Sequence, residues 1–430
     1  MLSVIRYDSA EGKALMAKIL SRAQFEIPGV QDFVDEAVRR VRTEGDAALF
    51  AYTEQFDHVK LDAASVRVSQ AEIEQAYKEV DSELLSVIRR AAKRIRAFHR
   101  KQKQNSWLEP EANGETLGQL VRPVETAGVY VPGGKAAYPS SVLMNIIPAQ
   151  VAGVPRIVMV TPCLNGEIVP VSVVAAVEAG VTEIYKIGGA QAVAALAFGT
   201  ESVPRVDKIV GPGNIYVAMA KRSVYGHVSI DSVAGPSEIL VIADETANPR
   251  FVAADLLSQA EHDELASAIL ITTSQTLGEA VAKELEAQTA LLSRKDIINK
   301  SLNDYGAILL VDSIEDAATL SNAAAPEHLE LCVTDAFALL PLIQNAGAIF
   351  MGHYTPEPLG DYMAGPNHVL PTGGTARFFS PLSVDDFVKK SSVLSFSKQA
   401  FEALSKDVIT FAESEGLTAH ANSVRVRVDE

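Results

Sequence analysis

The feature that most restricts the fold of this chain is a repeated alternation of short β-branched runs with alanine-rich helical stretches. Four such pairs follow one another in the first half of the chain. Strands are predicted at 128–131, 156–161, 183–187 and 206–210, and helices at 141–151, 170–178, 190–198 and 214–221. Parallel strands need long crossover connections, so this order predicts a parallel sheet with helices on both faces.

A second series with the same alternation follows. Residues 30–104, which precede both series, carry apolar side chains at three- and four-residue intervals and are predicted to form a helical opening section. We therefore expect the α/β class, with two doubly wound, Rossmann-like parallel-sheet domains and a boundary near residue 115. The strands of the second series are predicted near 239–242, 268–272, 307–311, 329–333 and 348–351, with helices such as 250–260 between them.

The composition restricts the partners of the chain. Its 430 residues include 38 Lys and Arg against 54 Asp and Glu, and the net charge of −16 disfavours binding to nucleic acid or to an anionic membrane. Two cysteines, Cys163 and Cys332, argue against a disulfide framework and favour a reducing compartment. The N-terminus lacks the apolar core of a secretory signal, and no apolar run is long enough for a membrane span. We expect a soluble cytoplasmic protein.

Three glycine-containing turns follow predicted strands of the first series, at 133, 188–189 and 211–213. The backbone N–H groups of such turns can bind a pyrophosphate, and open α/β sheets bind ligands at the carboxyl ends of their strands. Each turn alone is more often only a tight connection. The last one has the G-x-G of a dinucleotide fingerprint, but Tyr216 replaces its third glycine. Together the turns favour a dinucleotide site.

A possible metal site lies at the end of a predicted helix. Gln259 and His262 are three positions apart, so both side chains leave the same helix face. An imidazole and a carboxamide oxygen suit a divalent ion such as zinc, and Asp361 or His420 could complete the set. The polar end of an amphipathic helix explains the spacing equally well. Asp361 lies in a Gly- and Pro-rich stretch, 353–383, whose length favours a functional loop.

Glu327 and His328 are adjacent where a predicted helix gives way to the strand 329–333. Histidine is the usual general base at neutral pH, and a neighbouring carboxylate could handle a second proton transfer. A solvated turn is the commoner explanation for such a pair. Cys163 could attack an aldehyde, but no His, Lys or Arg stands beside it in the sequence to lower its pKa, so this role is disfavoured.

Several longer motifs resemble those of histidinol dehydrogenases. The most specific stretch is IDSVAGPSEIL at 230–240, continued by DLLSQAEH at 255–262. The chain is similar to this family over nearly its whole length. Further matching motifs are GVYVPGG at 128–134, GPGN at 211–214, APEH at 325–328, GDY at 360–362, GPNH at 365–368 and EGLTAH at 415–420.

The resemblance implies a homodimer with a shared active site and one zinc ion per subunit. Gln259, His262 and Asp361 would bind the ion together with the partner subunit's His420. NAD would contact Tyr130, Gln191 and Asn214. The residues around the substrate would be Ser237, Gln259, His262, His328, Asp361, His368, Glu415 and His420.

The resemblance also implies a discontinuous first domain. Residues 24–115 and 237–380 would form one Rossmann-like domain with the zinc and acid–base residues, and 116–236 would form the second, which contacts NAD. Residues 1–23 and 381–430 would be extended terminal segments that form the dimer. The last fifty or so residues are too few to form a core alone, so they are expected to pack on something else.

The activity implied is the NAD-dependent, four-electron oxidation of L-histidinol through its aldehyde to L-histidine, the last step of histidine biosynthesis. His328 would accept the hydroxyl proton and Glu327 would activate water, while zinc would hold the substrate through its amino and imidazole nitrogens. Two alternatives remain. One is a zinc- and NAD-dependent dehydrogenase of the same fold acting on another amino or sulfonated alcohol. The other is a non-catalytic protein that binds a metal and a small molecule.

Overall fold

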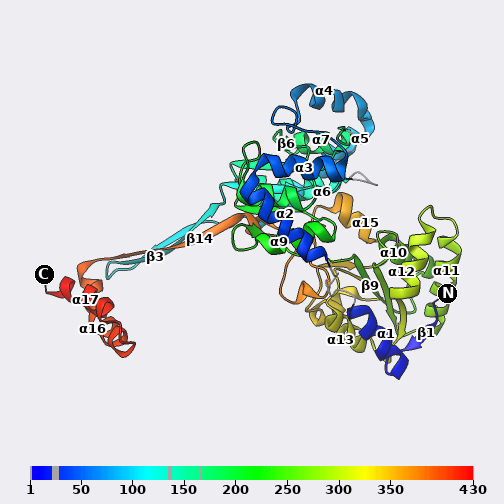
Figure 1. Ribbon diagram of the computed structural model, residues 1–430. Coiled ribbons are helices and arrows are strands. Elements are labelled where there is room, and N and C mark those ends of the chain that lie inside the picture. The colour runs from blue at the N-terminus through cyan, green and yellow to red at the C-terminus, as the bar shows by residue number, and fades with distance from the viewer. Residues whose placement is uncertain (1, 22–28, 134–137, 164–165, 234, 430) are drawn as a thin grey trace. The chain divides into compact units, whose positions relative to one another are not determined.

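The computed structural model describes residues 2–21, 29–133, 138–163, 166–233 and 235–429. Gly134 and Ala234 of the motifs above, and the start of the expected domain at residue 24, lie outside these residues. The chain forms two compact units, whose helices and strands are labelled in Figure 1. The larger unit comprises Met1–Gln102 and Glu125–Phe387, and the smaller unit comprises Lys103–Val124 and Val388–Glu430.

The first sheet of the larger unit has six parallel strands in the order β1, β11, β10, β9, β12, β13. Every residue of β9 and β10 is buried, as is typical of parallel strands covered on both faces. Within β9, Leu240 and Ile242 pack into one apolar cluster and Ile239 and Val241 into another, because successive side chains point to opposite faces. The strands are β1 Val4–Arg6, β9 Glu238–Ala243, β10 Ser267–Thr272, β11 Gly306–Leu310, β12 His328–Cys332 and β13 Ala348–Met351.

Helices cover both faces of the first sheet. The helices α1, α13 and α14 contribute buried residues to the cluster around Leu240, and α10, α11 and α12 contribute to the cluster around Ile239. Short helices α15 and η3 follow β13 and carry part of the Gly- and Pro-rich loop. The bounds are α1 Ala10–Ser21, α10 Pro249–Ala260, α11 Gln275–Thr289, α12 Lys295–Tyr305, α13 Ile314–Ala324, α14 Ala336–Leu339, α15 Glu357–Leu359 and η3 Gly360–Ala364.

The second sheet has five parallel strands in the order β6, β5, β4, β7, β8. The helices α8 and α9 lie on one face with α2 and α3, while α5 packs on α6 and α4 on α7. The strands are β4 Thr126–Tyr130, β5 Arg156–Val160, β6 Ile184–Tyr185, β7 Lys208–Val210 and β8 Ser229–Ile230. The helices are α2 Val30–Glu44, α3 Asp46–Asp57, α4 Gln70–Glu79, α5 Ser82–His99, α6 Pro139–Ala152, α7 Pro170–Glu178, α8 Gly189–Phe198 and α9 Ile215–Val224.

The two parallel sheets confirm the predicted fold class. The three glycine turns also lie where the alternation predicts them, because 133 follows β4, 188–189 follows β6 and 211–213 follows β7. All three therefore stand at the carboxyl ends of strands in one sheet. This is the edge at which an open α/β sheet binds its ligands.

The smaller unit is an antiparallel sheet with two helices. Its strand order is β14, β3, β2, and β14 pairs with β3 from Val388 opposite Pro123 to Phe396 opposite Glu115. Only Ala400, Ser405, Ala412, Ala421 and Val424 are buried along its helices, so the unit has little core of its own. The bounds are β2 Trp107–Pro110, β3 Glu115–Pro123, β14 Val388–Phe396, α16 Lys398–Ser414 and α17 Thr418–Val428.

The segments group differently from the expected domains. The helices α2 and α3, expected to join 237–380, instead pack with α8 and α9 because their apolar faces belong to the core of the second sheet. The boundary expected near 115 falls at the start of β3, inside the smaller unit. Of the terminal segments, β1 is a strand of the first sheet, and Val384 and Phe387 are buried in the larger unit.

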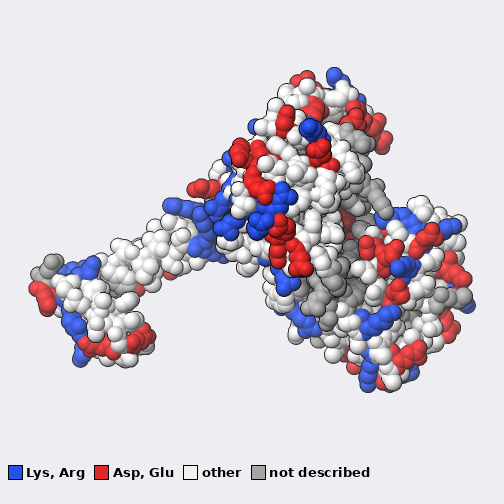
Figure 2. All heavy atoms as spheres, viewed as in Figure 1, with Lys and Arg blue, Asp and Glu red and all other residues white. Residues whose placement is uncertain are grey.

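The surface of the larger unit mixes charges of both signs. Acidic and basic side chains are interspersed over the face shown in Figure 2. Some of them form ion pairs, such as Arg89 with Glu178 and Arg156 with Glu183. In the described part of the chain, no helix combines the length and the apolar character needed to cross a membrane.

Gly211, directly after β7, should be sensitive to substitution. Its φ is 117°, and a Cβ there would lie 2.0 Å from the carbonyl oxygen of Tyr130. Gly226 has a similar φ of 100° but no atom within 4 Å of the Cβ position. We expect Gly226→Ala to lower the free energy of unfolding by about 1–2 kcal/mol through backbone strain alone. Gly211→Ala should lower the free energy of unfolding by about 1–3 kcal/mol more than Gly226→Ala does, because its Cβ would also overlap a backbone oxygen.

Thermal unfolding followed by circular dichroism measures the difference between these two variants. The Gly211 variant should show the larger fall in Tm. Equal falls for the two variants would mean that the close approach to Tyr130 does not constrain this turn.

Candidate active site

A cavity of about 280 Å³ lies where the two parallel sheets of the larger unit meet. Pro132, Gly211 and Gly213 line it from the carboxyl ends of the second sheet. The first sheet instead contributes its amino ends, because His328 opens β12 and Ser237 precedes β9. Open α/β sheets usually bind ligands at the carboxyl ends of their strands, and at this cavity only the second sheet does so.

Most of the predicted site residues of the larger unit meet at this cavity. They come from four separate stretches of the chain, which the fold brings to one place. Ser237, Gln259, His262, Glu327, His328, Asp361 and His368 all line its wall.

His328 has a defined tautomer. Its Nδ1 lies 2.9 Å from the carbonyl oxygen of Glu238 on the neighbouring strand, and a carbonyl only accepts hydrogen bonds, so Nδ1 carries the proton. Its Nε2 is buried with no hydrogen-bond partner among the described residues, and the ring is 4% exposed. Burial lowers the pKa of His328 to about 4, although the charge of Asp361 acts in the opposite direction. His328 is therefore neutral, with an available lone pair, at physiological pH.

Glu327 forms a reciprocal contact with Glu238. Its Oε2 accepts a hydrogen bond from the Glu238 backbone N–H at 2.9 Å, and its own N–H donates to Glu238 Oε2 at 3.3 Å. The Glu327 carboxyl lies 3.6 Å from Nδ1 of His328. Burial, and then the adjacent Glu238, raise the pKa of Glu327 well above its ordinary value. In the unliganded protein this carboxyl tends to hold a proton.

Gln259 and His262 approach the cavity from the end of α10. The helix ends at Ala260, before His262, and the His262 N–H donates to the Gln259 carbonyl at 3.0 Å. Gln259 is 1% exposed, yet neither carboxamide atom makes a hydrogen bond of normal geometry within the described residues. His262 lines the cavity and is exposed as a residue, but protein atoms around its ring exclude water, and this desolvation lowers its pKa.

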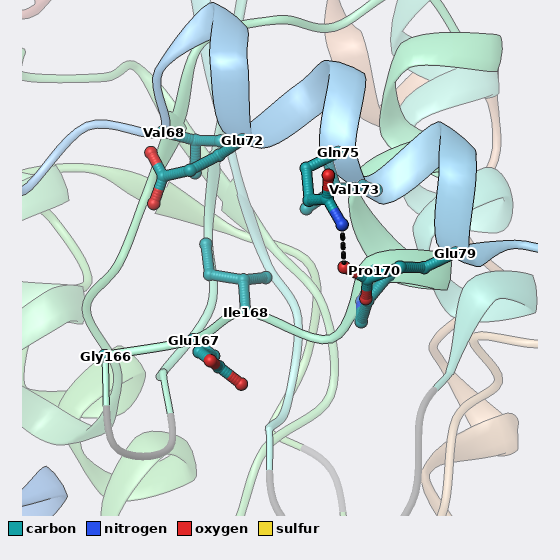
Figure 3. Close-up of a pocket in the computed structure, with 10 residues that line it drawn as sticks. Val68, Glu72, Gln75, Glu79, Gly166, Glu167, Ile168, Pro170 and Val173 are labelled. Carbon is teal, nitrogen blue, oxygen red and sulfur yellow. Dashed lines mark hydrogen bonds between the residues drawn. The ribbon is translucent and has the colours of Figure 1, made fainter.

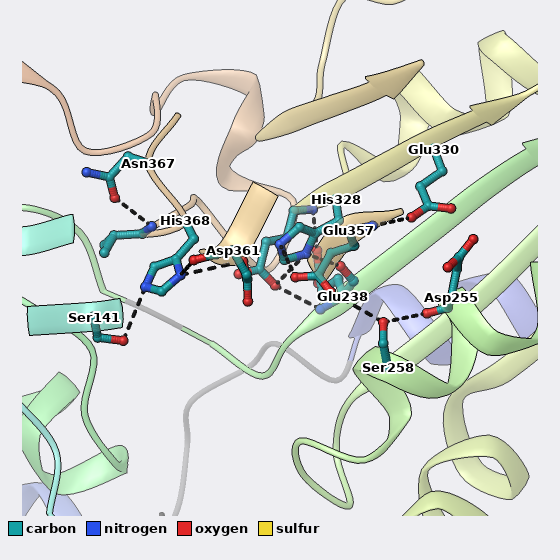
Figure 4. Close-up of polar contacts among 12 residues, drawn as sticks. Ser141, Glu238, Asp255, Ser258, His328, Glu330, Glu357, Asp361, Asn367 and His368 are labelled. Carbon is teal, nitrogen blue, oxygen red and sulfur yellow. Dashed lines mark hydrogen bonds and ion pairs between the residues drawn. The ribbon is translucent and has the colours of Figure 1, made fainter. Parts of the chain in front are cut away.

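Asp361 and His368 come from the Gly- and Pro-rich loop and lie against each other (Figure 4). The carboxylate oxygen Oδ1 of Asp361 is 3.5 Å from His368 Nδ1, which also faces the Asp361 carbonyl at 3.1 Å. Although burial raises the pKa of Asp361, its contacts with His368, His328 and Glu357 together outweigh this and hold the pKa low. On its other side, His368 Nε2 lies 3.2 Å from the Ser141 hydroxyl.

Sequence reasoning missed Glu357. It is 2% exposed on α15, its N–H donates to Glu330 Oε1 at 2.8 Å, and its Oε1 lies 3.6 Å from His328 Nε2 (Figure 4). Burial, and then Asp361, raise the pKa of Glu357. The donor atoms of His328, Glu357 and Asp361 all lie within 4.8 Å of one another. Only an acidic residue between two prolines marks this position in the sequence.

The predicted NAD contacts line a second cavity, of about 510 Å³, beside the second sheet. Tyr130, Gln191 and Asn214 all reach it. The Tyr130 hydroxyl accepts a hydrogen bond from the Gly189 N–H at 3.0 Å, so it holds one of the glycine turns. The side-chain oxygen of Asn214 accepts from the Val217 N–H and caps α9, which leaves its NH₂ group to donate to a ligand.

A third cavity, between α4 and the start of α7, contains none of the predicted residues (Figure 3). Glu72, Glu79 and Glu167 line it. Glu72 already has two structural roles, because it completes the capping box of α4 and forms an ion pair with Lys186 at 2.7 Å. We assign this cavity no part in the chemistry.

The remaining site candidates lie elsewhere in the chain. Glu415 and His420 belong to the smaller unit, at the end of α16 and on α17, and both are exposed within the described chain. Cys163 is buried, and burial raises the pKa of its thiol, which disfavours a nucleophilic role. The assignments of NAD contacts, metal ligands and acid–base roles stay predictions.

Comparison with known proteins assigns the family. A family model described as histidinol dehydrogenase matches residues 20–428. This chain belongs to the histidinol dehydrogenase family. Histidinol dehydrogenase of Syntrophotalea carbinolica is 55% identical over 430 residues, covering 100% of both chains. That of Geobacter sulfurreducens is 56% identical over 416 residues, covering 96% of this chain and 97% of its own.

A solved structure supports the same assignment. The crystal structure of histidinol dehydrogenase from Elizabethkingia anophelis matches with a TM-score of 0.94 at 39% sequence identity, covering 100% of this chain and 98% of that one. The family resemblance inferred from the motifs is confirmed.

Asp57, on the wall of the second cavity, should make stability depend on pH. Burial raises its pKa from 3.8 to about 6. A carboxyl whose folded pKa is raised stabilises the fold below its unfolded pKa and loses that contribution as the pH rises through the folded value. Asp57→Asn should therefore match the wild-type Tm near pH 4 and exceed it near pH 8. The gain should be about 1 kcal/mol, because the side chain is partly solvated.

Thermal unfolding of nucleotide-free protein at several pH values tests this expectation. Glu54→Gln, at an exposed position on the same helix, is the matched control. Its difference in Tm from wild type should not increase with pH. A constant offset between the Asp57 variant and wild type at all pH values would refute the assigned pKa.

Proposed function

We propose that this chain oxidises L-histidinol to L-histidine in two NAD-dependent steps, the last step of histidine biosynthesis. The observation that carries the proposal is the neutral His328, which lines the same cavity as Gln259 and Asp361 and whose buried Nε2 makes no hydrogen bond with the described residues. A base and a set of metal donors at one small cavity are what alcohol oxidation by hydride transfer requires. The family of the chain supports the choice of substrate.

The donor set fits a divalent ion such as zinc. Gln259 offers a buried carboxamide that makes no hydrogen bond of normal geometry with the described residues, which is costly unless something binds it. His262 adds an imidazole and Asp361 a carboxylate, both common zinc ligands, on the same wall. The alternative trio of His328, Glu357 and Asp361 would occupy the lone pair of the proposed base, so we favour the ligand set with Gln259. When bound, zinc would take the amino and imidazole nitrogens of the substrate and so fix its position.

In the first step, His328 is the general base. Its Nε2 accepts the proton of the substrate hydroxyl while the carbinol carbon transfers a hydride to NAD⁺, giving the aldehyde and NADH. The Glu238 carbonyl, which holds Nδ1–H, stabilises the imidazolium that forms. The low pKa of His328 in the empty site keeps the ring unprotonated and ready for this role.

In the second step, Glu327 in its ionised form takes a proton from water as the water adds to the aldehyde, and the His328 imidazolium returns its proton to the aldehyde oxygen, giving the gem-diol. The gem-diol transfers a second hydride to another NAD⁺ while His328 takes one of its hydroxyl protons, and the carboxylic acid that results loses its remaining proton to solvent and leaves as the carboxylate. His328 and Glu327 then release their protons to solvent. Glu327 tends to be protonated in the empty site, so positive charge in the loaded site is needed to lower its pKa. The proposed metal cation and the substrate ammonium group would supply that charge.

The nucleotide would extend from one cavity to the other. Pro132 lines both the small cavity with His328 and the larger one with Tyr130, Gln191 and Asn214. A dinucleotide with its adenosine in the larger cavity could therefore place its nicotinamide ring beside the substrate. The missing third glycine of the fingerprint fits an atypical Rossmann-like site, in which side chains replace part of the backbone cradle.

We further propose a homodimer in which the smaller unit packs on a second copy of the chain. This unit exposes many large apolar side chains, and its strands form a largely uncharged surface in Figure 2. Exposed apolar surface of this extent marks an interaction site. Glu415 and His420 lie exposed in this unit and would complete the partner's active site. The exposed apolar residues include Trp107, Leu108, Leu117, Leu394, Phe396, Leu404, Val408 and Phe411.

Kinetics with zinc and NAD⁺ test the proposed chemistry. Wild type should form about two NADH for each L-histidinol, because both oxidations occur in one site. Glu327→Gln should slow oxidation of the aldehyde by about 10²–10⁴-fold, and His328→Asn should slow oxidation of the alcohol by a similar factor. Absorbance of NADH measures both.

Metal analysis of the same variants separates the roles of the residues. His328→Asn should keep its zinc, whereas Gln259→Ala should lose it. Loss of zinc from the His328 variant would make His328 a ligand rather than the base. A wild-type reaction that stops at the aldehyde, or prefers another amino or sulfonated alcohol, would refute the proposed activity.

Mixed dimers test the shared active site. His328→Asn and His420→Ala should each be nearly inactive alone. If His420 acts across the dimer, a hybrid dimer has one site with both residues intact. Random reassembly of equal amounts should then restore about a quarter of the wild-type activity, since half of the dimers are hybrids with one good site each. No recovery in verified hybrids would place His420 in the site of its own subunit.

A further inference from the structure

The larger cavity beside the second sheet has a carboxylate that the proposed chemistry leaves without a role. Asp57, the last residue of α3, lines this cavity together with Tyr130 and Asn214. Three aromatic side chains complete its outer wall, and Phe33 and Tyr216 pack edge to face with their centroids 5.6 Å apart. A cavity with aromatic walls and a few polar groups is suited to a nucleoside.

Asp57 is poorly placed for stability. Its Oδ2 is buried and has no hydrogen-bond partner among the described residues. The residue ends a helix, where the negative end of the helix dipole disfavours another negative charge. A carboxylate that destabilises the empty protein suggests a ligand that satisfies it.

In this fold, the carboxylate at the position that usually binds the ribose hydroxyls is already bonded to other protein groups. In the ordinary dinucleotide fingerprint, an acidic residue about 20 positions after the glycine turn binds the ribose hydroxyls. Asp231, after β8, stands at that distance from Gly211. However, it forms a buried ion pair with Lys221 and accepts the Gly211 N–H at 2.7 Å. Lys221 in turn donates to the Gly211 carbonyl at 3.1 Å.

Asp231 therefore holds the glycine turn instead of a ligand. It also lines the small cavity with His328 and does not line the one with Asp57. Another carboxylate would therefore have to bind the ribose hydroxyls. Among the described residues that line the larger cavity, that carboxylate is Asp57.

We propose that Asp57 accepts hydrogen bonds from the hydroxyl groups of the adenosine ribose, and so makes the site select a dinucleotide without a 2′-phosphate. This inference rests on the proposed NAD-dependent function. Two ribose hydroxyls are donors that match a carboxylate whose buried Oδ2 makes no hydrogen bond with the described residues. A 2′-phosphate would instead place about two negative charges against Asp57.

The rest of the wall supports the same selectivity. None of the described residues that line this cavity is Lys or Arg, the side chains that bind a 2′-phosphate in NADP-dependent sites. Selection here would thus combine an attractive contact for one dinucleotide with repulsion of the other.

Binding measurements test the inference without relying on turnover. Fluorescence titrations with NADH and NADPH should show about 100-fold tighter binding of NADH to wild type, the scale expected when a buried hydrogen-bonding group loses its partner and faces a like charge. Asp57→Asn should weaken NADH binding about tenfold and reduce the preference over NADPH by at least tenfold. Glu54→Gln removes the same charge from an exposed position of α3 and should leave both affinities unchanged.

A modified ligand tests the inference on wild-type protein, so the result does not depend on whether the Asp57 variant folds. Wild type titrated with 2′-deoxy-NADH should bind it about tenfold more weakly than NADH. Equal affinity of wild type for NADH and 2′-deoxy-NADH would overturn the role of Asp57, and so would an unchanged ratio of NADH to NADPH affinity in folded Asp57→Asn. Either result would leave the proposed oxidation intact. A wild-type protein that binds neither NADH nor NADPH would overturn the proposed function, and this inference with it.

Discussion

The chemistry proposed for this chain depends on one hydrogen bond, from His328 Nδ1 to the backbone carbonyl of Glu238. It joins the first residues of two adjacent parallel strands, whose register sets His328 opposite Ile239. Because a carbonyl cannot donate, the bond selects the tautomer that keeps the lone pair on Nε2. The fully buried strands β9 and β12 thus position a general base, since the burial of their side chains fixes the register.

The two sheets contribute to the site in different ways. The second sheet presents glycine turns at the carboxyl ends of its strands, and the buried pair of Lys221 and Asp231 holds the last of these turns by both its N–H and its carbonyl. The first sheet presents side chains at the amino ends of its strands. A cofactor bound at the second sheet and a substrate bound by side chains of the first sheet can then meet between the two sheets.

Local patterns predicted the elements and several site residues. The alternation of strands and helices predicted both parallel sheets. The spacing of Gln259 and His262 predicted that their side chains leave one helix face, and both residues line the small cavity, although α10 ends at Ala260. The packing of α2 and α3 on the second sheet was not predictable, because an apolar helix face does not specify its partner. Glu357 and Asp57 were missed for a related reason. Each has a buried carboxylate oxygen that makes no hydrogen bond with the described residues, which only the folded chain shows.

The most direct test of the account is the protonation state of His328 at neutral pH. Nitrogen NMR of metal-free protein with ¹⁵N-labelled histidine, assigned with the His328→Asn variant, reports the proton on each ring nitrogen. The account predicts a neutral ring with the proton on Nδ1 and no titration until the pH falls toward about 4. A ring protonated on both nitrogens near pH 7, or a proton on Nε2 alone, would contradict the role of His328 as the general base.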